Sequence, residues 1–240
     1  MPKSKEGNGD QLLFYKIFVS ISTVTESKNN REGQKMLDQN GALKILDDLD
    51  VIQHGHFLLS SGRHSEVYVA KKKLYADLWQ TERICRAIAL PFINDCIDVV
   101  VGPESGGAYI AKLITQLLLR RKPSNNTIAI AARKHPDKTF SVEENKEGLL
   151  RGKNVLVVDD IVTTGGTLRG VIEMVRKNNG NVVSVGVMFD RGNVLKKPLE
   201  EPLKDIHKVF AFISVYYPDW EEPCPQCKQG IPLSPTPSKE

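Results

Sequence analysis

The spacing of apolar positions changes near residue 97. Before it, the pattern predicts helices over 37–49 and 77–93, separated by a hairpin of two short strands around the turn 60–62. After it, short runs of consecutive apolar residues alternate with amphipathic segments. Buried strands that alternate with helices predict an α/β fold with a central parallel sheet flanked by helices.

The second part of the pattern also predicts where ligands bind. Strands are expected at 97–102, 126–132, 154–160, 181–191 and 207–215, with helices at 106–121 and 167–178. In parallel sheets, ligands bind beyond the carboxyl ends of the strands. Asp159-Asp160 and Asp190-Arg191 stand at two such ends. We therefore expect the functional site at this edge of the sheet.

We expect a single domain over residues 36–233, since the first strongly patterned segment opens at Met36. Residues 1–35 are an extension of unknown role, and the Pro-containing tail 234–240 is expected to be disordered. Polar residues interrupt the apolar stretch 12–24, which is too short for a bilayer span of about 20 residues. No clean signal-peptide cleavage site follows it, so we expect no contact with a membrane.

Composition and charge place the chain among ordinary soluble proteins. Hydrophobic residues make up 40% and charged residues 26% of the chain. The net charge of 33 − 29 = +4 suits anionic substrates, but neither a nucleic-acid-binding motif nor a strongly basic face accompanies it. Four cysteines do not make a disulfide scaffold, which favours a cytoplasmic location.

The segment 155–168, VLVVDDIVTTGGTL, joins a buried strand to two carboxylates and a helix start. Free N–H groups and the dipole at a helix N-terminus bind anions. Glycines let a phosphate approach the backbone, and threonines add hydroxyl donors. These residues are Thr163, Thr164, Gly165, Gly166 and Thr167. Since Asp159 and Asp160 suit sugar hydroxyls or water-bound Mg²⁺, the segment predicts a sugar-phosphate site. It lacks the Gly-Lys-Ser/Thr of a Walker A loop.

This segment resembles the phosphoribosyl pyrophosphate signature of the type I phosphoribosyltransferases. The resemblance implies their fold, a central parallel sheet flanked by helices with a small N-terminal hood, here about residues 37–75. It also implies that Asp159 and Asp160 bind the ribose hydroxyls, with Mg²⁺ held through water. The loop 163–167 would then cradle the 5-phosphate.

Three further segments are similar to orotate phosphoribosyltransferases. HGHFLLSSGRHSEVYVAKK at 54–72 is similar to the segment that lines the base site, and it contains the candidate substrate-binding residues Ser61 and Arg63. CPQCKQGIPL at 224–233 is similar to the tail of the longer bacterial and archaeal forms. Arg191 matches the arginine that meets the orotate carboxylate, a role that suits a planar guanidinium. The implied reaction transfers ribose 5-phosphate from phosphoribosyl pyrophosphate to orotate.

Two other segments resemble the parts of that family that contact pyrophosphate. VGPESGG at 101–107 resembles the Gly-Pro loop. RKHPDK at 133–138 resembles a mobile loop that often acts across a dimer interface, which implies a homodimer. Its candidate catalytic and binding residues are Arg133, Lys134 and Lys138. The polar residues 137–150 fit a lid over the site.

The chain departs from the orotate pattern in ways that leave alternatives open. Ser60 and Gly106 stand where many members have lysine, and Lys71 and Arg63 are candidates to supply that charge. These differences leave open a transferase for another base, such as a purine. Because the lysine spacing of the basic loop is also altered, a non-catalytic sensor of phosphoribosyl pyrophosphate remains open as well.

Cys224 and Cys227 have the spacing of half a zinc site. Cys85 and Cys96 lack such spacing, so no second cysteine pair is available. A site with four ligands would then require a symmetric partner chain. We therefore favour a tail that binds no zinc.

Overall fold

A computed structural model describes most of the chain from residue 37 onward. The described residues are 37–59, 61–123, 126–192, 194–195, 202–203, 205–214 and 219–235. The extension 1–35, Ser60 and the end of the tail, 236–240, lie outside them. In the described part of the chain, no helix has the length and apolar character needed to cross a membrane.

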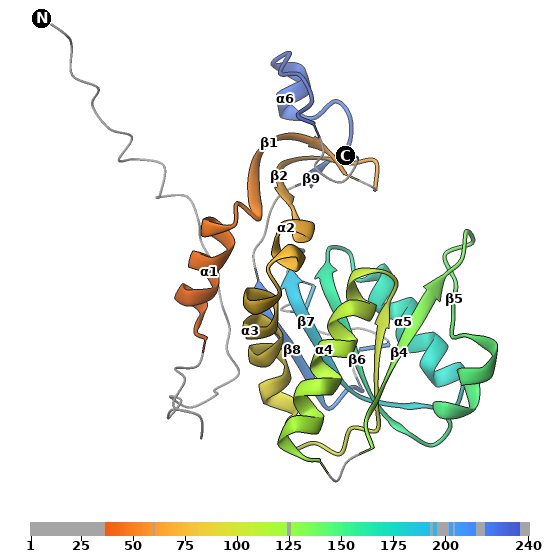
Figure 1. Cartoon of the computed structure of the whole chain (residues 1–240). Helices are drawn as coiled ribbons and strands as arrows, with labels where there is room; N and C mark the ends of the chain where they lie inside the picture. Colours follow the sequence, from red (N-terminus) through yellow and green to blue (C-terminus); the bar gives the residue numbers. More distant parts are fainter. Residues whose placement is uncertain are drawn as a thin grey trace, which may run out of the picture.

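A six-stranded sheet lies at the centre of the domain, in the order β5-β4-β3-β6-β7-β8 (Figure 1). The strands are β3 (Val99–Pro103), β4 (Ile128–Lys134), β5 (Phe140–Ser141), β6 (Asn154–Val162), β7 (Asn181–Asp190) and β8 (Lys208–Ser214). All neighbouring pairs are parallel except β4 and β5. The predicted central parallel sheet is confirmed, with one short antiparallel strand added at its edge.

Helices cover both faces of this sheet. Successive β6 side chains point to opposite sides and are apolar on both, so each face needs a helix layer to bury it. Leu156 and Val158 face a core shared with α3 (Leu78–Ala89) and α4 (Gly106–Arg121). Val155 and Val157 face the other core, shared with α5 (Gly166–Lys177). Burial on both faces explains why these strands are apolar without alternation. Two 3-10 helices, η1 (Leu90–Phe92) and η2 (Glu144–Leu149), complete the connections.

A second, three-stranded sheet forms the hood, which lies above the main sheet in Figure 1. It consists of β1 (Ile52–Leu58), β2 (His64–Val69) and β9 (Asp219–Trp220). The helices α1 (Gln39–Asp48) and α2 (Lys71–Ala76) flank this hairpin in the sequence, and α6 (Pro225–Lys228) follows β9. The hood therefore contains C-terminal as well as N-terminal residues, whereas the sequence predicted it from residues 37–75 alone.

The first residue of the predicted disordered tail, Ser234, has a defined place in the hood. Its N–H donates to the carbonyl of His56 at 2.7 Å, and its Oγ accepts the His56 N–H at 3.0 Å. The contacts of the hood therefore extend to Ser234, one residue beyond the predicted domain.

Candidate active site

Asp159 and Asp160 lie in the last part of β6, and each residue is only 4% exposed. Asp160 Oδ2 accepts hydrogen bonds from Lys71 Nζ at 2.6 Å and from the Tyr75 hydroxyl at 2.8 Å. Its Oδ1 accepts the Ile161 N–H at 2.7 Å. Lys71 and Tyr75 belong to α2, so this carboxylate joins the hood region to the main sheet.

The two carboxylates are electrostatically coupled. Burial raises the pKa of Asp159 well above its usual range, and the negative charge of Asp160 raises it further. Burial, followed by the charge of Asp160, likewise raises the pKa of Tyr75, so its hydroxyl stays a neutral donor. A buried acidic pair of this kind favours a cation beside it, and Lys71 already supplies one.

The predicted phosphate loop leads from β6 into α5. Gly165 precedes the helix with φ +78°, a left-handed conformation that glycine adopts without a Cβ clash. In this described segment no side chain caps the N-terminus of α5, which leaves its N–H groups directed outward for an anion. A Cβ on Gly192 would lie 1.8 Å from the Thr163 carbonyl oxygen, so the chain after β7 packs directly on this loop.

Gly106 lies against the same carboxylate that Lys71 contacts. A Cβ at this position would lie 1.7 Å from Asp160 Oδ2 and 3.0 Å from the Tyr75 hydroxyl. Gly106 opens α4 within the Gly-Pro loop, whose Glu104–Ser105 peptide bond is cis. The Lys71 amine and Gly106 thus lie against the same Asp160 oxygen, so Lys71 brings a positive charge to the position where many members of the family have lysine in place of Gly106.

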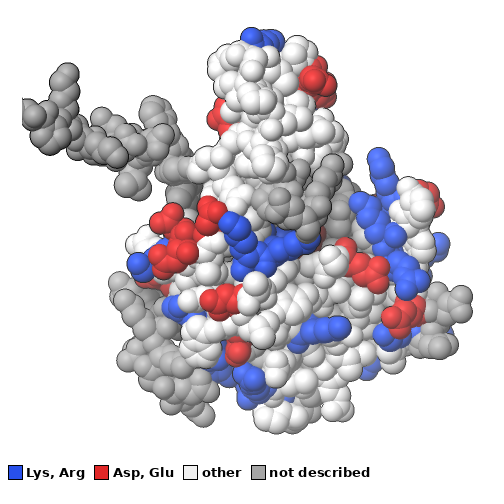
Figure 2. All heavy atoms as spheres, turned by 45° about the horizontal axis from the view of Figure 1, so that its top comes forward, with Lys and Arg blue, Asp and Glu red and all other residues white. Residues whose placement is uncertain are grey.

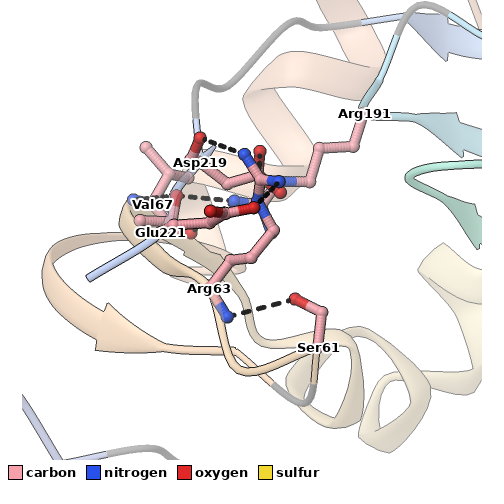
Figure 3. A network of polar contacts seen from close by, with 7 residues as sticks. Ser61, Arg63, Val67, Arg191, Asp219 and Glu221 are labelled. Carbon is pink, nitrogen blue, oxygen red and sulfur yellow. Dashed lines mark hydrogen bonds and ion pairs between the residues drawn. The ribbon is translucent and has the colours of Figure 1, made fainter. Parts of the chain in front are cut away.

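Arg191 lies between the main sheet and the hood (Figure 3). Its guanidinium is buried and donates from Nη2 to Ser65 Oγ at 2.6 Å and to the Val67 carbonyl at 3.2 Å. The parallel register pairs Val162 with Asp190, and the Arg191 N–H donates to the Val162 carbonyl at 2.8 Å. Arg191 therefore follows a strand end that adjoins the phosphate loop.

Ser61 and Arg63 lie at the turn of the hood hairpin (Figure 3). Arg63 forms ion pairs with Asp219 at 3.2 Å and Glu221 at 3.6 Å, and it donates to the Asp219 carbonyl at 3.0 Å. Ser61 Oγ accepts the Arg63 N–H at 3.4 Å. The contacts of Arg63 thus join β9 to the hairpin, and Lys71 rather than Arg63 approaches the carboxylate pair.

The basic segment 133–138 comprises the end of β4 and the turn that leads into β5 in the β4–β5 hairpin. Arg133, Lys134 and Lys138 are exposed, and Arg133 lies 3.9 Å from a Glu104 carboxylate oxygen. Phe140 packs on Gly170, because a Cβ there would lie 2.7 Å from the ring. Figure 2 shows basic side chains at several places on the face that the hood overhangs, including a group directly below the hood. Part of the predicted lid is therefore a hairpin anchored on α5.

Sequence reasoning missed Tyr75 and Gly192. Tyr75 stands four residues after Lys71, so the two side chains share one face of a helix, a spacing that could have identified it. Gly192 carried no comparable signal, since its closeness to Thr163 depends on how two loops pack.

Comparison with known proteins agrees with this geometry. Residues 75–219 match the family described as Phosphoribosyl transferase domain. The orotate phosphoribosyltransferase of Thermoanaerobacter sp. (strain X514) is 36% identical over 202 residues, covering 82% of this chain and 96% of the relative. That of Thermotoga maritima is 32% identical over 196 residues, covering 79% and 93%.

Two crystal structures share the fold. Orotate phosphoribosyltransferase from Aeropyrum pernix superimposes with a TM-score of 0.52 at 24% identity, covering 71% of this chain and 92% of that one. Adenine phosphoribosyltransferase from Rhodothermus marinus gives 0.56 at 18% identity, covering 74% and 100%. At these identities the structures support the fold and not the choice of base.

A family match over more than half of the chain places it among the phosphoribosyltransferases, as its β6 segment predicted. The curated relatives narrow the class further. The chain belongs to the orotate phosphoribosyltransferase family.

Proposed function

We propose that the protein transfers ribose 5-phosphate from phosphoribosyl pyrophosphate to orotate, giving orotidine 5′-monophosphate and pyrophosphate in pyrimidine nucleotide synthesis. One observation carries the proposal: the β6–β7 register pairs Val162 with Asp190. It supports a single site in which the phosphate loop after β6 adjoins Arg191, the residue proposed to bind the orotate carboxylate.

The sugar end of the substrate would bind at the end of β6. Asp159 and Asp160 accept hydrogen bonds from the ribose hydroxyls, and the α5 N-terminus with its preceding loop binds the 5-phosphate. This division follows from charge, because carboxylates repel the phosphate while helix N–H groups attract it. The loop residues in this role are Thr163, Thr164, Gly165, Gly166 and Thr167.

The leaving group requires cations. Departure of pyrophosphate leaves positive charge on the ribose and negative charge on the leaving oxygens, so catalysis consists of positioning and electrostatic stabilisation. Lys71 supplies a cation beside Gly106, and its 2.6 Å contact with Asp160 supports this role. Arg133, Lys134 and Lys138 supply others from the β4–β5 hairpin. All three are exposed and so are accessible to a second chain. We propose that the protein is a homodimer in which they act across the interface. We also propose a cytoplasmic location.

The residues present also suit Mg²⁺. Carboxylate oxygens are the ligands that this hard ion prefers, and it commonly keeps several waters. Asp159 and Asp160 would hold it, and a cation would relieve the burial and the repulsion from Asp160 that together raise the pKa of Asp159. When bound, the ion supplies positive charge for the pyrophosphate oxygens.

The direct test combines the purified protein with Mg²⁺, phosphoribosyl pyrophosphate and orotate, and follows the loss of orotate absorbance. We expect orotidine 5′-monophosphate as the product, identified by mass spectrometry. A panel of adenine, guanine, hypoxanthine and uracil is assayed in parallel. Turnover of a purine without turnover of orotate would contradict the assignment of the base. Binding of phosphoribosyl pyrophosphate without turnover of any base would contradict an enzymatic role.

A further inference from the structure

Four metal-binding side chains meet inside the hood, away from the sugar-phosphate site. His56 comes from β1, His64 from the start of β2, and Cys224 and Cys227 from the tail around α6. One potential ligand atom from each lies within 4.8 Å of all the others. The first three residues are buried and Cys227 is half-buried, so the cluster is enclosed within the hood.

This cluster corrects the interpretation of the Cys224-x-x-Cys227 motif. A second cysteine pair is indeed absent from the four cysteines of the chain, yet the hairpin supplies two histidines instead. The four donors therefore come from one chain, and no partner chain is needed. The histidines lie 160–171 residues before the cysteines and gave no spacing signal, because only the fold of the hood brings them together.

The distances between donor atoms suit one tetrahedral ion. His56 Nε2 lies 2.8 Å from His64 Nδ1, 3.3 Å from Cys224 Sγ and 3.6 Å from Cys227 Sγ. Cys227 Sγ lies 3.4 Å from His64 Nδ1. For a tetrahedral zinc ion, the usual bond lengths place nitrogens about 3.4 Å apart and nitrogen and sulfur about 3.6 Å apart. Small side-chain movements would therefore complete the geometry.

The surroundings of the cluster orient its donors. The His56 Nδ1 lies 2.8 Å from the Ile231 carbonyl oxygen and can donate its proton there. That hydrogen bond leaves the His56 Nε2 lone pair directed at the cluster, the arrangement usual for metal-bound histidine. The Cys227 N–H donates to Cys224 Sγ at 3.3 Å, which holds that sulfur in place beside the histidines.

We propose that His56, His64, Cys224 and Cys227 bind a structural zinc ion. A two-sulfur, two-nitrogen tetrahedral set is typical of zinc, and four protein ligands leave no open position for catalysis. The ion fastens the tail to the β1–β2 hairpin. It thereby stabilises the position of Ser65, the neighbour of His64, which accepts the hydrogen bond from buried Arg191. The proposal does not depend on which base the protein uses.

Metal analysis of the purified full chain tests this proposal. We expect about one zinc ion per chain by elemental mass spectrometry after expression with zinc and extensive dialysis. Cys224→Ser, Cys227→Ser, His56→Asn and His64→Asn should each lose most of this zinc. Cys96→Ser and His54→Asn are matched controls, because both residues are exposed and lie outside the cluster. Both controls should retain the zinc of the unchanged protein.

Two further measurements keep the result decisive if a variant fails to fold. Replacing zinc by Co²⁺ in the unchanged protein should give the visible bands of tetrahedral cobalt together with thiolate-to-cobalt charge transfer. A chelator strong enough to remove the zinc should lower the thermal unfolding midpoint. The proposal is overturned if the dialysed protein holds no zinc, or if Cys224 and Cys227 are recovered as a disulfide. Full zinc content in Cys224→Ser and His64→Asn would overturn it equally.

Discussion

Lys71 Nζ lies 2.6 Å from Asp160 Oδ2, which places a cation of helix α2 at the end of strand β6. Lys71 thus brings an amine beside Gly106, a position where many orotate phosphoribosyltransferases have lysine. We expect Lys71→Ala to reduce kcat by about 10²-fold, since a positioned charge beside the reacting groups is removed. Lys71→Arg should recover part of the loss. Steady-state kinetics with orotate and phosphoribosyl pyrophosphate measure both changes.

Lys72→Ala is the matched control for this prediction, because Lys72 is an exposed neighbour on the same helix. It should keep kcat within a factor of about two. Equal losses in the Lys71 and Lys72 variants would contradict a specific role for Lys71.

Gly106→Ala should displace the Asp160 carboxylate, because the added methyl would lie 1.7 Å from Oδ2. We expect a loss of about 1–3 kcal/mol in the free energy of unfolding, the usual cost of overpacking, together with a large fall in kcat. Gly148→Ala is the control, since the space around a Cβ there is open and no positive φ applies. Chemical denaturation and kinetics of both variants test the prediction. Unchanged turnover in Gly106→Ala would contradict the packing described.

Gly165→Ala separates backbone strain from phosphate binding. Its φ of +78° makes alanine cost about 1–2 kcal/mol, and the phosphate loop should shift to relieve it. Gly152→Ala, at φ +69° with open surroundings, should carry a similar cost away from the site. We expect both variants to lose stability and only Gly165→Ala to raise the KM for phosphoribosyl pyrophosphate. Equal KM values in the two variants would argue against phosphate binding at this loop.

Asp159→Asn should stabilise the protein while it abolishes turnover. Because burial raises the folded-state pKa of Asp159 above its unfolded value, the folded state binds more protons between the two values. Stability then falls as pH rises through that window, and the carboxylate is a net cost above it. The thermal midpoint of the variant, measured without Mg²⁺, should therefore exceed that of the unchanged protein by an amount that grows above about pH 4.

Asp47→Asn, which removes a carboxylate from an exposed position, is the control. Its thermal midpoint at neutral pH should stay close to that of the unchanged protein, because surface substitutions usually change stability little. If the thermal midpoint of Asp159→Asn at neutral pH did not exceed that of the unchanged protein, burial would not oppose ionisation of this carboxyl.

Arg191→Lys should weaken binding of orotate more than binding of phosphoribosyl pyrophosphate. The planar guanidinium pairs with a carboxylate through two bonds, and lysine keeps the charge without that geometry. We expect the KM for orotate to rise about 10- to 100-fold, the usual value of one or two hydrogen bonds to a charged group. The KM for phosphoribosyl pyrophosphate should change far less. If only the KM for phosphoribosyl pyrophosphate rose, Arg191 would contact that substrate and not the orotate carboxylate.

Much of the main sheet could be predicted because its signals are local. The helix expected at 106–121 is confirmed at both ends, since a Gly-Gly start and a continuous amphipathic run mark it. The strand expected to end at Asp160 continues to Val162, because β7 remains paired with it as far as Asp190. Asp159 and Asp160 consequently lie inside the strand.

The hood was predicted less completely because its contacts span most of the chain. Trp220 pairs with His64, and Ser234 bonds to His56, contacts that no local pattern encodes. For Tyr75, whose hydroxyl reaches Asp160, the only local signal is its spacing of four residues from Lys71, because its helix is too short to give a clear period. Long-range pairing of this kind depends on packing between segments.

The pairing of β9 with β2 has a consequence for the order in which the protein matures during synthesis. The ribosome releases all six strands of the main sheet before residues 219–234 emerge. A chain that ends before residue 219 therefore contains every strand of the sugar-phosphate half of the site, while its hairpin lacks the third strand. The hood around Arg191 is completed last, so a product truncated before residue 219 would have its main sheet but an incomplete hood.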